Sequence, residues 1–273
     1  MLKNIIVLCL AFFNSSAMKY NDYSNRWEGN WFPHSPNELD QNPVVQLKGS
    51  NNIDSKHGVV MGIRNPECDD AKTNLTLDWD MNPTNYTCFG GKDLYQPNSY
   101  IHPVHSYEYI PASYNAQHKC MDESIEYSEI VPTFGTHRPL WPKYGEYKFV
   151  PRQRWIHNLE HGAVVMLYHP CANKNEVNLL KEIVRGCLFK HIITPYNLLS
   201  PNRPLALVTW GHRLEMSKIS KSLVVRFIRE HAHRGPEDTF KDGQYDFYLT
   251  RPAKFVSGFK DSNLCPTERD IMK

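Results

Sequence analysis

The sequence of 273 residues lacks the patterns that mark several common classes of protein. Its formal net charge is only +2, from 31 lysines and arginines against 29 aspartates and glutamates, so no basic surface for nucleic acid is indicated. It contains no glycine-rich phosphate-binding loop and no G-x-S-x-G nucleophile motif. These absences argue against a nucleic-acid-binding protein, a P-loop nucleotide-binding enzyme and a serine hydrolase of that motif.

Long apolar segments are missing except at the N-terminus. Lys3 precedes an apolar run over residues 5–13, and the small residues Ser15 and Ala17 follow it. This order predicts a secretory signal peptide over residues 1–17, with a buried N-terminal strand as the alternative. The run is shorter than the ~20 residues that span a bilayer, and no later run is long enough either. We therefore expect a secreted, extracellular chain without a membrane span, whose partner is an extracellular protein or a small ligand.

The chain has no C-x-x-C pair, which argues against a thioredoxin-like redox site and a zinc knuckle. One of its seven cysteines lies in the predicted signal peptide. An even number in a secreted chain predicts disulfide bonds, with 15 possible pairings for six cysteines. Short separations favour Cys68 with Cys88 and Cys171 with Cys187. The six cysteines are Cys68, Cys88, Cys120, Cys171, Cys187 and Cys265.

Two N-glycosylation sequons begin at Asn74 and Asn85. The surrounding residues 65–99 are rich in Asn, Thr, Pro and Gly, which predicts loops. A glycan must sit in water, and an exposed loop meets that need. We therefore predict that Asn74 and Asn85 carry glycans.

Apolar patterning predicts a sheet with helices in the second half of the chain. Residues 163–170 have the continuous apolar character of a central strand, and 191–196 and 205–211 are further strands. A helix is predicted over 175–190, with its first residue as N-cap, and a second helix after Ser217. The order strand, helix, strand, strand, helix predicts an α/β or α+β core. We expect a small mixed sheet with two amphipathic helices and a loop-rich, disulfide-pinned N-terminal part.

The chain divides into four predicted regions. The signal peptide at 1–17 precedes an irregular N-terminal arm with glycosylated loops at 18–123, a core domain at 124–240 and a C-terminal tail packed on the core at 241–273. Short strands are also predicted within 58–63 and 124–133, from an apolar run and an alternating pattern respectively.

Five segments occur in an order that resembles a known family: PTFGTHRPLWPKYGEY (132–147), WIHNLEHGAVVMLYHP (155–170), ITP (193–195), LVTWG (207–211) and GPE (235–237). They resemble the family of tumour protein p fifty-three-inducible protein thirteen, whose prokaryotic relatives form the domain of unknown function 3105. The resemblance implies a fold region but no agreed activity, and the family name implies a link to growth control. Animal members carry a membrane-spanning segment after this domain, which we do not expect in this chain.

The stretch HNLEHG matches the H-x-x-E-H pattern of the inverted zinc proteases. If the chain between Pro151 and Gly162 is helical, His157 and His161 lie one turn apart on one face. Two imidazoles at that spacing can hold zinc or copper. Glu160 lies beside them, as an orienting residue or, in a hydrolase, as the catalytic general base.

A metal site needs a third ligand, and His137 in the turn GTHRP is the first choice. Other histidines are reserves because they end predicted strands or form an H-x-x-H pair. The reserves are His169, His212, His102 and His105.

Two alternatives to a metal site stay open. The metalloprotease hypothesis is weakened because the helix is short and no glutamate-rich second helix follows, so the pattern does not favour an enzyme. In a purely structural arrangement, the two histidines bind backbone carbonyls and Glu160 accepts from Arg154 or Trp155. The chain is then an extracellular interaction module that contacts its partner through aromatic residues of the arm, namely Tyr20, Tyr23, Trp27, Trp31 and Phe32.

Overall fold

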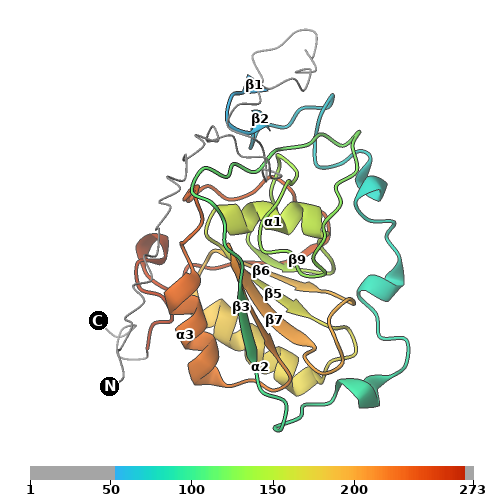
Figure 1. The fold of residues 1–273 in the computed structure, drawn as a ribbon, viewed down its shortest axis with the longest axis vertical. Coiled ribbons are helices and arrows are strands. Elements are labelled where there is room, and N and C mark those ends of the chain that lie inside the picture. Colours follow the sequence, from blue (N-terminus) through green and yellow to red (C-terminus); the bar gives the residue numbers. More distant parts are fainter. Residues whose placement is uncertain (1–52, 268–273) are drawn as a thin grey trace, which may run out of the picture. The chain divides into compact units, whose positions relative to one another are not determined.

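The computed structural model of the protein describes residues 53–267, all within the unit Leu47–Lys273 (Figure 1). The predicted signal peptide and the aromatic residues proposed to contact a partner lie outside these residues. Within them, no helix is long and apolar enough to cross a membrane.

A seven-stranded mixed sheet forms the centre of the fold, in the order β3-β8-β7-β5-β6-β4-β9. β5 and β4 each pair in parallel with β6, and the other neighbours are antiparallel. The sheet confirms the predicted mixed α/β class. Its strands are β3 (Val104–Tyr107), β4 (Gly145–Tyr147), β5 (Val164–Tyr168), β6 (His191–Pro195), β7 (Leu205–Thr209), β8 (His212–Met216) and β9 (Leu249–Pro252).

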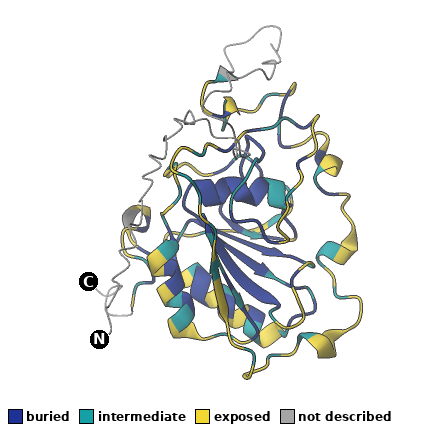
Figure 2. Ribbon diagram, in the orientation of Figure 1, coloured by how far each residue is buried: buried dark blue, intermediate teal, exposed yellow. Residues whose placement is uncertain are grey.

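Three helices cover the two faces of the sheet, and all have buried inner sides (Figures 1 and 2). Val164 and Met166 of β5 pack with α2 (Lys174–Cys187) and α3 (Lys221–His231). The alternate residues Val165 and Leu167 pack with α1 (Arg152–Glu160) on the other face. Side chains alternate across a strand, so β5 separates two hydrophobic clusters.

The two predicted amphipathic helices are confirmed, with shifted starts. The N-cap of α2 is Asn173 rather than Asn175, and its side chain accepts from the backbone N–H groups of Asn175 and Glu176. The helix predicted after Ser217 begins at Lys221. Both helices owe their position to apolar residues at three- and four-residue spacing, which bury one stripe against the sheet.

The edge strands come from segments outside 124–240. β3 precedes that range, and β9 follows it. The strand predicted within 124–133 is absent: the carbonyl of Ile130 accepts from the Tyr196 hydroxyl, and that of Val131 accepts from Arg213. Side chains therefore satisfy this backbone in place of a neighbouring strand.

The segment before the sheet has little regular structure. Only Gly58–Val59 of the predicted strand at 58–63 is a strand (β2), paired with β1 (Ile53–Asp54). Short 3-10 helices occupy Leu75–Leu77, Pro83–Asn85 and Lys92–Tyr95, and another lies at Phe259–Asp261.

All six cysteines form disulfides, but the two local pairings predicted from the sequence are wrong. The chain after Cys68 runs along the domain before it returns (Figure 1), and the backbone N–H of Met121 donates to the Cys68 carbonyl (2.8 Å). Cysteines that are close in the sequence therefore lie apart in the fold and pair with distant ones. The pairs are Cys68–Cys120, Cys88–Cys171 and Cys187–Cys265, across 52, 83 and 78 residues.

Candidate metal centre

The helix predicted between Pro151 and Gly162 is α1, and its C-terminal end is closely defined. Gly162 has a φ of 79°, which favours glycine. Its N–H donates to the Leu159 carbonyl (2.9 Å), and the N–H of Ala163 donates to the Asn158 carbonyl (2.9 Å). These two bonds form a Schellman motif, which stops the helix and turns the chain into β5.

A segment around Gly235 packs against this helix end. The N–H of His233 donates to the Gly162 carbonyl (2.8 Å), and the N–H of Glu237 donates to the Glu160 carbonyl (3.1 Å). A Cβ on Gly235 would lie 2.1 Å from the Glu160 carbonyl oxygen, so only glycine allows this approach. We call residues 233–237 the strap.

Two histidines reach α1 from a loop without regular structure. His118 and His137 pair in an isolated parallel β-bridge. The N–H of Lys119 donates to the His137 carbonyl (3.0 Å), and the N–H of His137 donates to the Gln117 carbonyl (3.1 Å). The bridge holds both histidines beside the helix.

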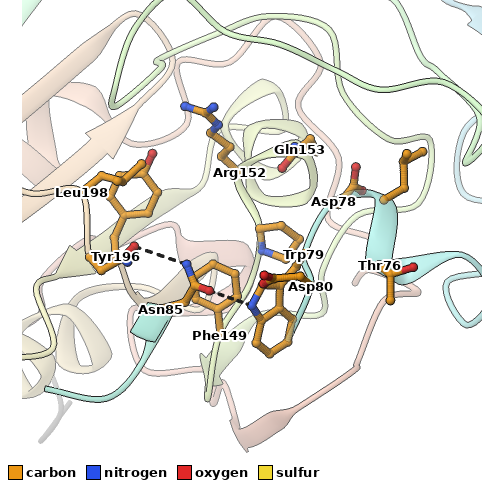
Figure 3. Close-up of a pocket in the computed structure, with 13 residues that line it drawn as sticks. Thr76, Asp78, Trp79, Asp80, Asn85, Phe149, Arg152, Gln153, Tyr196 and Leu198 are labelled. Carbon is orange, nitrogen blue, oxygen red and sulfur yellow. Dashed lines mark hydrogen bonds between the residues drawn. The ribbon is translucent and has the colours of Figure 1, made fainter. Parts of the chain in front are cut away.

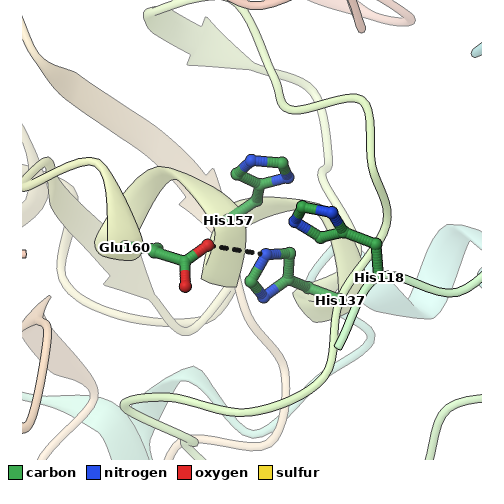
Figure 4. A group of neighbouring side chains, drawn as sticks. All are labelled: His118, His137, His157 and Glu160. Atoms are coloured by element: carbon green, nitrogen blue, oxygen red, sulfur yellow. Dashed lines mark ion pairs between the residues drawn. The ribbon is translucent and has the colours of Figure 1, made fainter. Parts of the chain in front are cut away.

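Four side chains converge between the bridge and α1 (Figure 4). His118, His137, His157 and Glu160 each offer one ligand atom, and these atoms lie within 4.8 Å of one another. The His137 and His157 ring centres are 4.4 Å apart, and His118 stacks on His157 at 4.9 Å. A single ion could therefore be held by this group, which we call the buried cluster.

Backbone carbonyls determine which nitrogen of each imidazole is free. A carbonyl only accepts, so a ring whose Nδ1 contacts one carries its proton on Nδ1 and leaves the Nε2 lone pair available. This holds for the three cluster histidines and for the adjacent His161. The contacts are His118 to Val59 (2.8 Å), His137 to Gly135 (2.8 Å), His157 to Arg138 (2.6 Å) and His161 to Glu237 (2.7 Å).

The Nε2 atoms of these four histidines are buried and have no hydrogen-bond partner among the described residues. A buried polar atom left in this way costs about 1–3 kcal/mol. The Nε2 of His137 also lies 3.1 Å from the Glu160 Oε2, itself without a hydrogen bond. A lone pair facing a carboxylate is repulsive, so a proton or a cation must lie between them.

Burial governs the protonation of the cluster. It lowers the pKa of His118 to about 3 and that of His157 well below its usual range, and in both cases neighbouring imidazoles lower it further. Burial alone would raise the pKa of Glu160, but the adjacent imidazoles, chiefly His137, lower it to about 2. At neutral pH the cluster thus offers the Glu160 carboxylate together with the neutral imidazoles of His118 and His157.

Nearby arginines do not neutralise Glu160, because each is bound elsewhere. Arg138 makes a bidentate contact with Asp78 (2.6 and 2.9 Å), and Arg154 binds Asp69. Among residues 53–267, the ion-pair partner of Glu160 is His137. The interaction with Arg154 or Trp155 that the structural alternative required is not formed.

Other contacts enclose the buried cluster. His57 stacks on His118 at 4.9 Å, and its Nε2 lies 2.8 Å from the Glu237 carboxylate. Trp141 packs against His157 and His161, with ring centres 4.9 and 4.7 Å away. Each cluster side chain is at most 4% exposed, so the group is closed to solvent.

The structure brings together some of the histidines expected from the sequence and separates others. His161 lies beside the cluster, 4.7 Å from the His157 ring, rather than within the group of four. His169 stacks on Tyr95 in another part of the fold. His102 is exposed, whereas His105 and His212 form a second group with His231.

His118 was not among the candidates from the sequence. It stands in the stretch AQHKC without a neighbouring histidine or a recognisable motif. Its one local signal is the nearby Cys120, which ties this loop to Cys68.

Residues 118–243 match the family model described as "Protein of unknown function (DUF3105)". The match begins at His118 and ends beyond the strap, so it contains the buried cluster. No curated protein and no solved structure matches the chain.

Proposed function

We propose that this protein binds one transition-metal ion, zinc or copper, through His118, His137, His157 and Glu160. The supporting observation is that three buried imidazoles have Nδ1 held by a carbonyl and Nε2 beside a buried carboxylate, with no hydrogen-bond partner for Nε2 in the described part of the chain. Hydrogen bonds that fix the second nitrogen of a ligating histidine are the usual support of a metal site.

The donor set favours zinc or copper over harder cations. Imidazole nitrogen suits zinc, copper, iron and nickel, whereas magnesium and calcium prefer oxygen ligands. Disulfide bonding of all six cysteines outside the predicted signal peptide leaves no thiolate to compete. Three nitrogens and one carboxylate oxygen supply the four ligands of a tetrahedral zinc ion.

The closed geometry supports a binding or structural role over hydrolysis. A catalytic zinc keeps one position open for water, whereas a structural zinc has four protein ligands. Here four donors are present, and each is at least nine-tenths buried. In this role the ion joins the loop of His118 and His137 to α1.

His161 remains part of the proposal as an adjoining donor. Its Nε2 is buried and no described residue forms a hydrogen bond with it, and burial lowers the pKa of His161 to about 4. The contact of its Nδ1 with the Glu237 carbonyl ties the strap to the helix.

Metal analysis of the protein, purified without a polyhistidine tag, tests this function. After reloading, brief EDTA treatment to remove loosely held metal and gel filtration, we expect about one equivalent of zinc or copper, and a loss of that equivalent in His157→Gln. His169→Gln is the matched control, because that ring lies outside the cluster. Less than about 0.2 equivalents in the folded wild-type protein would exclude the proposal.

Export and glycosylation are also proposed. The three disulfides are compatible with an oxidising compartment. Asn74 is exposed, as a glycan site requires. Asn85 is half-buried, accepts from the Trp79 indole (3.1 Å) and donates to Asn197 (3.3 Å), as Figure 3 shows in part. We therefore expect fuller glycan occupancy at Asn74 than at Asn85, measurable by mass spectrometry of peptides.

An extracellular interaction module is the second candidate, and exposed tyrosines favour it. Tyr100, Tyr107 and Tyr109 are 92%, 75% and 83% exposed. Tyrosine is enriched at protein interfaces. Binding of the labelled protein to cell surfaces, lost in the triple Tyr→Ser variant, would support this role.

We also propose a relationship to the tumour protein p fifty-three-inducible protein thirteen family. The five segments quoted from the sequence support it.

A further inference from the structure

A second group of histidines differs from the buried cluster because it is partly exposed to solvent. His105, His212 and His231 each offer one ligand atom, and these atoms lie within 4.8 Å of one another. His212 stacks on His231 with ring centres 4.1 Å apart, and His105 lies 4.9 Å from His231. His105 is exposed, and the other two are half-buried.

Regular secondary structure positions all three rings. β3 and β8 are antiparallel, and His105 is opposite Leu214 while His212 is opposite Tyr107. His105 and His212 are therefore diagonal neighbours on one face of the pair, within reach of each other. His231 is the last residue of α3, which packs over that face. The arrangement is held by backbone pairing rather than by a loop.

Hydrogen bonds among the three imidazoles do not provide a partner for every buried ring nitrogen. The His105 Nε2 lies 3.3 Å from the His212 Nδ1, so one of these two rings must donate to the other. The Nε2 of His231 is buried and has no hydrogen-bond partner within residues 53–267, and a carboxylate oxygen of Glu230 lies 3.9 Å away. A shared cation would serve all three nitrogens.

A cavity of about 260 Å³ opens beside the group. It lies between β3, β8 and α3, with Arg226 and Glu230 at its polar part. Three protein ligands leave at least one coordination position free, and His105, which lines this cavity, is exposed to solvent. The buried cluster has four donors and no such access.

We infer that His105, His212 and His231 form a second, solvent-facing site for Cu²⁺ or Zn²⁺, with an open position that takes water or a small anion. The ion in this site exchanges readily, whereas the buried ion does not. This inference stands whether or not the buried cluster holds a metal, because the two sites share no residue.

Copper titration of the untagged full chain tests the second site. We expect one equivalent of Cu²⁺ that EDTA removes within seconds, with nitrogen hyperfine splitting in its electron paramagnetic resonance spectrum. His105→Ala and His212→Ala should each weaken this equivalent by about tenfold or more. His102→Ala is the control, since it removes an exposed histidine three residues away on the same segment.

The variants also separate this site from the buried one. His157→Gln should leave the EDTA-labile equivalent unchanged, and His212→Ala should leave any tightly held metal unchanged. Titrations that are the same for His105→Ala, His212→Ala and wild type would overturn the inference. Equal weakening by His102→Ala would also overturn it.

Azide tests the open position. Added to the copper-loaded protein, it should produce an azide-to-copper charge-transfer band, absent from His212→Ala at the same copper concentration. No band in a protein whose copper equivalent is present would overturn the open position.

Discussion

His118 and His137 pair through their backbones in an isolated parallel bridge, which places their imidazole rings 5.0 Å apart. The bridge lies against α1, where His157 and Glu160 project toward it (Figure 4). The cluster therefore forms only when the loop and the helix have docked. An ion bound there would stabilise that docking, because it binds the folded chain and not the unfolded one.

Removal of metal should lower the stability of the protein. An ion present at about 100 times its dissociation constant contributes about 2.7 kcal/mol to the free energy of unfolding. Chelation should therefore lower the melting temperature by several degrees, and reloading should restore it. Circular dichroism melting with parallel metal analysis measures both quantities. An unchanged melting temperature after verified removal would contradict this expectation.

Glu160→Gln should reduce metal affinity by about tenfold or more, because it removes the only charged donor of the proposed set while keeping the shape of the side chain. Competition with a chromophoric chelator measures the affinity. Glu123→Gln is the matched control, since Glu123 is exposed, pairs with Lys119 and is not one of the four cluster residues. Equal affinity in wild type and Glu160→Gln would show that this carboxylate is not a ligand.

Stability of the metal-free protein should fall as pH drops below about 6.5, the unfolded histidine pKa. Burial lowers the pKa of His191 to about 4 in the folded state, so the unfolded state takes up its proton first. Above pH 6.5 this residue costs no stability. As pH falls from 6.5 toward 4, protonation of His191 in the unfolded state lowers the free energy of unfolding by about 3 kcal/mol.

Urea unfolding at pH 7 and at pH 4.5 measures the effect. The free energy of unfolding also falls with pH because of three other histidines whose pKa values are lowered, His118, His157 and His161. His191→Gln should show a smaller loss between the two pH values than wild type, whereas His102→Gln should match wild type. A wild-type stability that rises at the lower pH would contradict the assigned direction.

Gly235→Ala should destabilise the protein by about 1–3 kcal/mol or more, because its Cβ would overlap the Glu160 carbonyl oxygen and displace the strap. Gly186→Ala in α2 is the control. Apart from the adjoining backbone of α2 itself, no atom of the described residues lies within 4 Å of a Cβ there, so the better helix propensity of alanine should raise stability by about 0.5–1 kcal/mol. Similar effects in both variants, measured by urea unfolding, would contradict the role of Gly235.

Much of the central fold could be predicted from local patterns. The strands at β5, β6 and β7 and the helices α2 and α3 follow from apolar runs and from helical spacing. The edge strands β3 and β9 could not, because they are short and mostly exposed, so they carry no burial pattern. The alternating segment 124–133 predicted a strand, but no neighbouring strand is available to it.

The candidate metal site was also only partly predictable from local sequence. The H-x-x-E-H spacing and the flanking Pro151 and Gly162 predict a helix with two histidines one turn apart, and α1 has this geometry. Nothing local indicates that His118 joins them, or that His161 lies just outside the group. The distinction depends on the bridge between His118 and His137.

The sequence by itself determined the elements whose signals are local: the two amphipathic helices, the buried strands, the helix that carries His157 and Glu160, and the presence of disulfides. Only the tertiary structure decided which cysteines pair, which strands close the sheet and which imidazoles meet. Local patterns report the preferences of a chain over a few residues. Contacts between distant residues depend instead on how loops close and on which buried polar groups find partners once they have closed.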